Sequence, residues 1–79
     1  MTKVTGRQLR MARVSMKFRV DDLSKKADVS WARVQHLERS DDVLEQTDKV
    51  EKLINFFEAN NIVFYEGNEV YYPYIKIKK

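Results

Sequence analysis

Apolar residues recur along this chain with two different periods, which divide it into a helical part and a shorter strand-forming part. The clearest helical repeat places apolar side chains at i, i+3, i+4 and i+7, in Val50, Leu53, Ile54 and Phe57. Thr47 stands before this repeat as its N-cap. Asn60 and Asn61 follow it, and Asn is the next choice after Gly for a left-handed helix stop. The pattern predicts a helix that begins after Thr47 and runs to about Asn60.

Two shorter helical repeats lie upstream and are joined by a tight turn. Leu23 and Ala27 are four positions apart on the first, and Val34 and Leu37 are three positions apart on the second. Val29 lies in the turn and faces the same small core. Two crossing helices need apolar side chains where they touch, so the pattern predicts a helix-turn-helix.

Three polar residues fit the ends of these paired helices. Asp28 occupies the turn position that usually needs a left-handed backbone, which Asp tolerates better than most residues. Ser30 is the N-cap of the second helix. Arg19 is a poor cap, so we expect the first of the two helices to start late, with Asp21 as its cap.

A further helix is predicted at the start of the chain, from about Gly6 to Met16, with Thr5 as its N-cap. Its apolar stripe consists of Leu9, Ala12 and Met16. A basic amphipathic helix of this kind can also lie at a membrane surface. Because the stripe is short and the following helices need a partner, packing into the core is the better explanation.

Two connecting segments each add one apolar anchor. Phe18 is expected to fill the space between the first helix and the paired helices. Residues 40–46, with the sequence SDDVLEQ, form a loop in which Val43 or Leu44 is tucked inward.

Residues 62–77 change to β-branched and aromatic types, in two runs separated by a Gly-Asn pair, which predicts a β-hairpin. A two-residue Gly-Asn turn would place Tyr65 opposite Val70. This register also sets Glu66 against Glu69, so a shift of one residue is the alternative.

Side chains alternate between the two faces of such a hairpin. One face holds Ile62, Phe64, Tyr71, Ile75 and Ile77. The other holds Val63, Tyr65, Val70, Tyr72 and Tyr74. The last helix can cover one face, and little chain remains for the other. Because an exposed aromatic face beside an unpaired strand edge is a binding surface, we expect a homodimer through the second face.

Basic charge is concentrated in the helix-turn-helix half. Residues 1–40 contain ten Lys or Arg against four acids, a formal charge of +6, whereas residues 41–79 carry −3. A solvated basic face would explain the charge alone. Its coincidence with a helix-turn-helix favours a surface on which nucleic acid docks.

The residue types that build catalytic sites are scarce. The chain has one His, no Cys and no Gly-rich phosphate loop, so we expect no enzyme, no metal and no other cofactor. No run approaches the roughly 18 apolar residues of a membrane span. The opening MTKVTGRQLR lacks the apolar segment of a signal peptide, so we expect a cytoplasmic protein without membrane contact.

The chain resembles the Xre/Cro-repressor family of helix-turn-helix DNA-binding domains. The similarity covers roughly residues 4–65 and rests on Gly6-Arg7-Gln8-Leu9-Arg10, Ala12-Arg13, Asp22-Leu23, Val29-Ser30, Gln35 and Leu37-Glu38-Arg39. It implies a mainly α fold, a four-to-five-helix repressor-like bundle with a C-terminal β-hairpin. Residues 1–61 would form the DNA-binding domain, and residues 62–79 the hairpin as a dimerisation element.

By this resemblance we expect a repressor-like regulator of transcription that reads double-stranded DNA with the helix starting at Ser30, and the hairpin would make it a homodimer. Base-edge contacts are expected from Trp31, Ala32 and His36. Phosphate contacts are expected from Ser30 and Arg39. The direction of two further side chains on this helix depends on its tilt in the groove, namely Arg33 and Gln35. Four basic residues outside this helix complete the expected DNA surface, namely Arg7, Arg10, Lys17 and Arg19.

The chemistry of these residues leaves two alternatives open. Trp31 and Ala32 offer only apolar contact, for example to a thymine methyl, and Trp31 could equally pack at a subunit contact. His36 can donate or accept at a base edge, or it is an ordinary surface residue. The family also buries a charged pair between the first and recognition helices, so we expect a salt bridge between Arg13 and Glu38.

The chain departs from the family pattern at four places. The paired helices usually open with Ser-Gln, where this chain has Arg19 and Val20. The usual turn Gly is Asp28, and the usual Gly after the Glu-Arg pair is Ser40. The missing Gln would otherwise clamp a phosphate or touch a base. The missing Gln at Val20 and the apolar Trp31-Ala32 start of the second helix favour an alternative function, a protein-interaction module such as an antitoxin or an adaptor that does not read DNA by itself.

Overall fold

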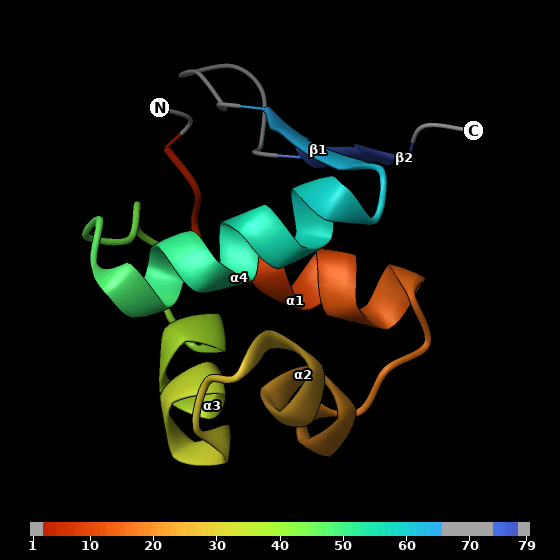
Figure 1. Ribbon diagram of the computed structural model, residues 1–79. Coiled ribbons are helices and arrows are strands. Elements are labelled where there is room, and N and C mark those ends of the chain that lie inside the picture. The colour runs from red at the N-terminus through yellow and green to blue at the C-terminus, as the bar shows by residue number, and fades with distance from the viewer. Residues whose placement is uncertain (1–2, 66–73, 78–79) are drawn as a thin grey trace.

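The computed structural model describes residues 3–65 and 74–77, and for residues 74, 76 and 77 the backbone alone. This part of the chain is mainly helical, as predicted. Its helices are α1 (Gly6–Ser15), α2 (Val20–Ala27), α3 (Trp31–Glu38) and α4 (Asp48–Ala59), and its strands are β1 (Ile62–Tyr65) and β2 (Tyr74–Ile77). Helices α1 and α4 form a middle layer, with the two strands on one side and the α2–α3 pair on the other (Figure 1).

One hydrophobic core joins the helices to the sheet. The predicted apolar positions of α2, the turn, α3 and α4 are buried, and Leu37 is half-buried beside them. The strand residues Ile62 and Phe64 belong to the same core, and the Phe64 ring meets Phe57 edge-on at 6.0 Å between centroids. In the loop after α3, Leu44 is the buried residue, whereas Val43 is 55% exposed.

Most helix ends follow the predicted caps. The Thr5 side chain accepts a hydrogen bond from the Gln8 backbone N–H, and the Thr47 side chain accepts one from the Val50 backbone N–H. Asp28 adopts the left-handed conformation, with φ 58° and ψ 48°. Helix α1 ends one residue earlier than predicted, at Ser15. Local side-chain chemistry therefore sets where most of these helices begin and end.

The expected start of α2 was wrong. The helix begins at Val20, and Arg19 holds the N-cap position that was assigned to Asp21. The Asp22 carboxylate accepts a hydrogen bond from the Arg19 backbone N–H at 2.9 Å. An acid at the third helical position thus satisfies the N–H of the cap residue, and the Arg19 side chain makes no capping hydrogen bond of its own.

The predicted strand register was also wrong. Tyr65 pairs with Tyr74 and Ile62 with Ile77, four positions further along the second strand than a two-residue turn would give. A displacement by an even number keeps each side chain on its predicted face. Phe64 and Ile75 therefore still face the core together.

Two residues at the start of α1 hold the layers close together. A Cβ on Gly6 would collide with the carbonyl oxygens of Leu37 and Ser40, so only Gly lets α1 approach the end of α3 this closely. Gln8 is fully buried. Its side-chain oxygen accepts from the Thr5 N–H at 2.9 Å, and its side-chain nitrogen donates to the Tyr65 carbonyl at 2.6 Å.

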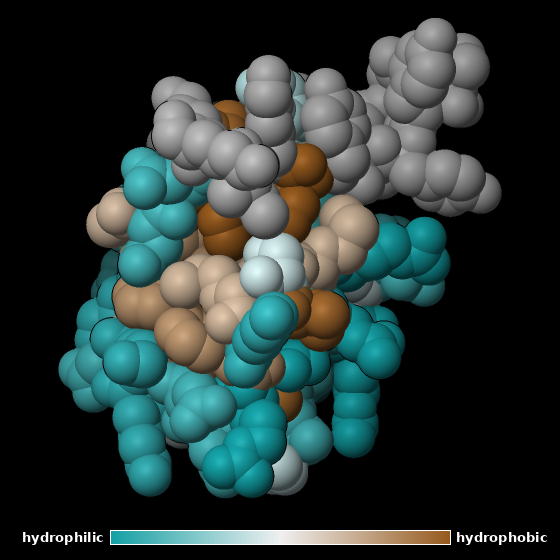
Figure 2. All heavy atoms as spheres, turned by 90° about the vertical axis from the view of Figure 1, so that its right-hand side faces the viewer, coloured by the Kyte–Doolittle hydropathy of each residue, from teal (hydrophilic) through white to brown (hydrophobic). Residues whose placement is uncertain are grey.

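The surface differs in character between the two ends of the molecule. Figure 2 shows apolar side chains gathered at the middle of one face, and hydrophilic side chains covering the end that α2 and α3 occupy. Over the described ranges, none of the helices has the length and apolar character needed to cross a membrane.

Candidate nucleic-acid interface

Helix α3 lies at the surface with one side anchored in the core. Val34 is buried, and packing against α1 and α2 fixes the helix in place. Ser30 caps it by accepting a hydrogen bond from the Arg33 N–H at 3.2 Å. The outer side consists of exposed residues, namely Ser30, Trp31, Ala32, Arg33, His36 and Arg39. We call this set the α3 face.

The α3 face combines an apolar leading end with polar flanks. Trp31 is 46% exposed, which is unusual for the largest apolar side chain in a small domain. A shallow hollow of about 320 Å³ lies on the same face and is lined by Ser30, Ala32, Arg33 and His36. The face therefore offers an aromatic ring, a methyl group, an imidazole and two guanidinium groups to a partner.

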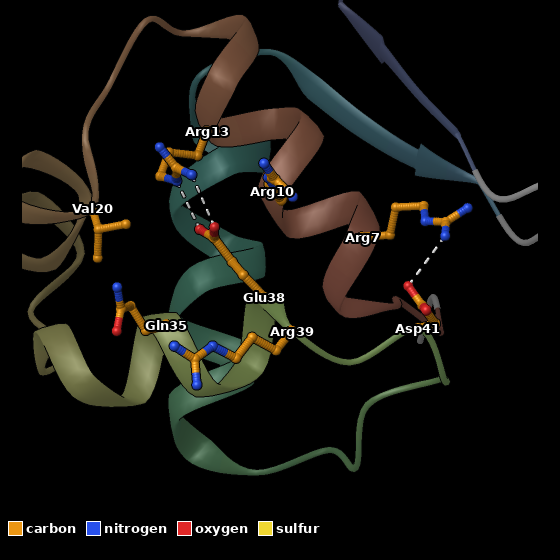
Figure 3. Close-up of a pocket in the computed structure, with 8 residues that line it drawn as sticks. All are labelled: Arg7, Arg10, Arg13, Val20, Gln35, Glu38, Arg39 and Asp41. Carbon is orange, nitrogen blue, oxygen red and sulfur yellow. Dashed lines mark hydrogen bonds and ion pairs between the residues drawn. The ribbon is translucent and has the colours of Figure 1, made fainter.

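A second hollow, which we call the arginine pocket, opens between α1 and α3. Its volume is about 460 Å³. Its lining comes from α1, the start of α2, the end of α3 and the following loop (Figure 3), and consists of Arg7, Arg10, Arg13, Val20, Gln35, Glu38, Arg39 and Asp41. Four guanidinium groups thus share one small space with two carboxylates.

Two of the four arginines are neutralised by these carboxylates. Arg13 pairs with Glu38 at 2.8 Å, and Arg7 pairs with Asp41 at 3.2 Å. Within the described part of the chain, Arg10 and Arg39 have no ion-pair partner. The free positive charge of the arginine pocket therefore belongs to Arg10 and Arg39.

The predicted Arg13–Glu38 salt bridge is confirmed. Arg13 Nε donates to Glu38 Oε2 at 2.8 Å and Arg13 Nη2 donates to Glu38 Oε1 at 3.0 Å. Arg13 Nη1 also donates to the Phe18 carbonyl at 2.9 Å. The side chains are only 15% and 8% exposed. This bidentate salt bridge connects α1 to α3. The bond to the Phe18 carbonyl connects α1 to the segment before α2.

The structure brings some of the predicted DNA-facing residues together and leaves others apart. Arg7, Arg10, Gln35 and Arg39 meet in the arginine pocket. Lys17 and Arg19 are exposed in the segment between α1 and α2 and do not line it, and the Arg19 guanidinium lies 3.9 Å from Asp22.

Asp41 and Val20 were not placed at this site from the sequence, although both line the arginine pocket. Asp41 lies in the loop after α3 and pairs with Arg7, which was expected to belong to the DNA surface. No local signal joins residues 34 positions apart. Val20 lines the arginine pocket where the family usually has Gln. Gln8, which ties α1 to the sheet, could have been found from the Thr-x-x-Gln capping box.

The expected dimer surface is described only in part. Val63 and Tyr65 are half-buried in β1. Val70 and Tyr72 lie outside the described residues, as does the side chain of Tyr74. The homodimer therefore stays a prediction.

A metal site among the described residues, or similarity of the chain to known proteins, would also indicate a function. Within residues 3–65 and 74–77, no group of three His, Cys, Asp or Glu side chains could hold a metal ion. The chain matches no protein-family model, no curated protein and no solved structure.

Proposed function

We propose that this protein is a sequence-specific DNA-binding regulator of transcription, built as a repressor-like helix-turn-helix bundle of the Xre/Cro type. The observation that carries the proposal is the α3 face. Its leading residues are exposed on a helix that the core and the Arg13–Glu38 pair hold rigidly. A single exposed helix fits the width of the major groove.

Each residue of the α3 face has a chemical role in this proposal. Trp31 and Ala32 make apolar contacts, for which the thymine methyl is the available partner in the major groove. His36 donates to or accepts from a base edge. Arg33 can reach a base or a phosphate, and Ser30 and Arg39 each contact a phosphate. The phosphate contacts position the protein on the DNA, and the base contacts recognise its sequence.

The proposed active form is a homodimer joined through the hairpin. A two-fold dimer would present two copies of α3, which enter successive major grooves about 34 Å apart. The operator is then an inverted repeat whose half-sites are centred about one helical turn apart. Selection of bound duplexes from a random pool gives the operator directly, and a selected site without two-fold symmetry would contradict the dimer.

Trp31 makes the DNA test direct, because it is the only Trp in the chain and lies on the proposed interface. Its fluorescence should change when random duplex DNA is added, and the affinity should fall steeply as salt rises. Free nucleosides at the same base concentration are the control. Unchanged fluorescence and no band shift at low salt would contradict the proposal.

A second function is supported by two features of the same region. Val20 cannot make the contact of the usual Gln, and an exposed Trp31 suits a protein partner as well as a base. An adaptor or antitoxin would bind little DNA at any salt concentration. The salt series therefore separates the two functions.

A further inference from the structure

We propose that the arginine pocket is a seat for one phosphate group, held jointly by Arg10 and Arg39, and that the DNA backbone supplies this phosphate. The inference rests on the proposed function and adds to it a defined anion site between α1 and α3. It also separates Arg10 from Arg7, which from the sequence were placed together on the expected DNA surface.

The charges of the pocket select these two residues. Arg13 and Glu38 neutralise each other through two hydrogen bonds and are largely buried. Asp41 occupies Arg7 at the rim. Within the described residues, only Arg10 and Arg39 bring uncompensated charge to the pocket lining.

The pocket is held open by the pair at its back. Figure 3 shows the Arg13–Glu38 bond joining α1, which also carries Arg10, to the end of α3, where Arg39 lies. Arg10 lies one helical turn before Arg13, and Arg39 follows Glu38 directly, so this bond fixes the relative position of the two free arginines. The helix segments that carry Arg10 and Arg39 are therefore in place before the anion arrives, and only the two exposed side chains must be ordered around it.

The remaining lining suits a phosphate. A guanidinium presents a planar fork of donors that matches two phosphate oxygens, and two such forks can hold one tetrahedral anion. Gln35 adds a neutral donor, and Val20 adds an apolar wall. A volume of about 460 Å³ accommodates a phosphate with its ester carbons and bridging water.

The test compares salt dependence among Arg10→Ala, Arg39→Ala, the double variant and the wild type, with random duplex DNA as the probe. Each phosphate contact contributes about 0.9 to the slope of log Kobs against log salt concentration. If both arginines hold one phosphate, the double variant lowers the slope by about 0.9 in total. Two separate phosphates would lower it by about 1.8, and that result would overturn the shared seat.

Matched variants separate the seat from general electrostatic attraction. Lys25→Ala removes one exposed positive charge outside the pocket and should change the slope by less than either arginine variant. Arg10→Lys with Arg39→Lys keeps both charges but loses both forks, and should weaken binding severalfold. Full affinity of the lysine variant would overturn the proposal. Circular dichroism checks that each variant is folded.

A second probe separates this inference from the proposed function. Inorganic phosphate, followed by nuclear magnetic resonance, should perturb residues of the pocket in the wild type and not in the double alanine variant. If the wild type binds phosphate there but no duplex, the seat stands and the DNA function fails. If it binds duplex and the double alanine variant keeps the wild-type slope, the DNA function stands and the seat fails. Binding of neither probe would overturn both.

Discussion

Breaking the Arg13–Glu38 pair on one side should destabilise the domain severely. Arg13→Met leaves the Glu38 carboxylate, 8% exposed, without its cation, and also leaves the Phe18 carbonyl without its donor. Stranding one member of a buried ion pair costs about 3–5 kcal/mol. A domain of this length has a free energy of unfolding of about 4–12 kcal/mol. The single variant should therefore lose a large share of the free energy of unfolding.

The double variant Arg13→Met, Glu38→Leu tests whether the loss comes from the stranded charge. With both charges removed, apolar side chains of similar length can fill the space, so this variant should be more stable than either single variant. Urea unfolding followed by far-ultraviolet circular dichroism measures all four proteins, and a variant unfolded without urea gives a lower limit. Single variants that each lose less than about 1 kcal/mol would refute the reasoning, as would a double variant less stable than both.

Four further predictions follow from individual contacts. Gly6→Ala should lower the free energy of unfolding, measured by urea unfolding, by at least about 1–3 kcal/mol. The methyl group of the new alanine collides with the Leu37 carbonyl oxygen. Asp28→Gly should raise the melting temperature slightly, by relieving a left-handed non-glycine residue, whereas a fall would contradict the strain argument. Ser30→Ala should cost about 1 kcal/mol through the lost N-cap, with Ser30→Thr as the control in the same melts. His36→Ala should relax the preference at one operator base pair by roughly 1–3 kcal/mol, and a uniform loss over all sequences would contradict a reading role.

The helices could be predicted from the sequence because their signals are local. Thr47 and Asn61 sit at the ends of α4, and the apolar repeat between them determines which side faces the core. The left-handed Asp28 is likewise dictated by its place between two helices. Each of these features depends on residues within about four positions, a range over which sequence spacing fixes spatial proximity.

The misjudged features depend on residues that are distant in sequence. The register of β1 and β2 follows from packing Phe64 and Ile75 on the core, while the sequence reasoning assumed the shortest possible turn. The choice of Leu44 over Val43 depends on the Leu44 N–H donating to the Val4 carbonyl at 2.8 Å. Periodicity carries no information about such contacts.

The candidate site shows the same division. The exposed face of α3 followed from helical spacing, and the Arg13–Glu38 pair followed from the family resemblance alone. The Arg7–Asp41 pair had no signal of either kind. The division of the arginines into neutralised and free members could therefore be seen only in three dimensions.

The buried amide of Gln8 makes the sheet and the first turn of α1 a single cooperative unit. Opening of β1 at Tyr65 would take the Tyr65 carbonyl away from the buried Gln8 side-chain nitrogen, and fraying of α1 at Thr5 would take the Thr5 N–H donor away from the Gln8 side-chain oxygen. Local fluctuations that release one element should therefore release the other. In native-state hydrogen exchange, the amides at the end of β1 and at the start of α1 should share one opening free energy. Because α1 also carries Arg10 and Arg13, a change in the stability of the sheet would then reach the arginine pocket through α1.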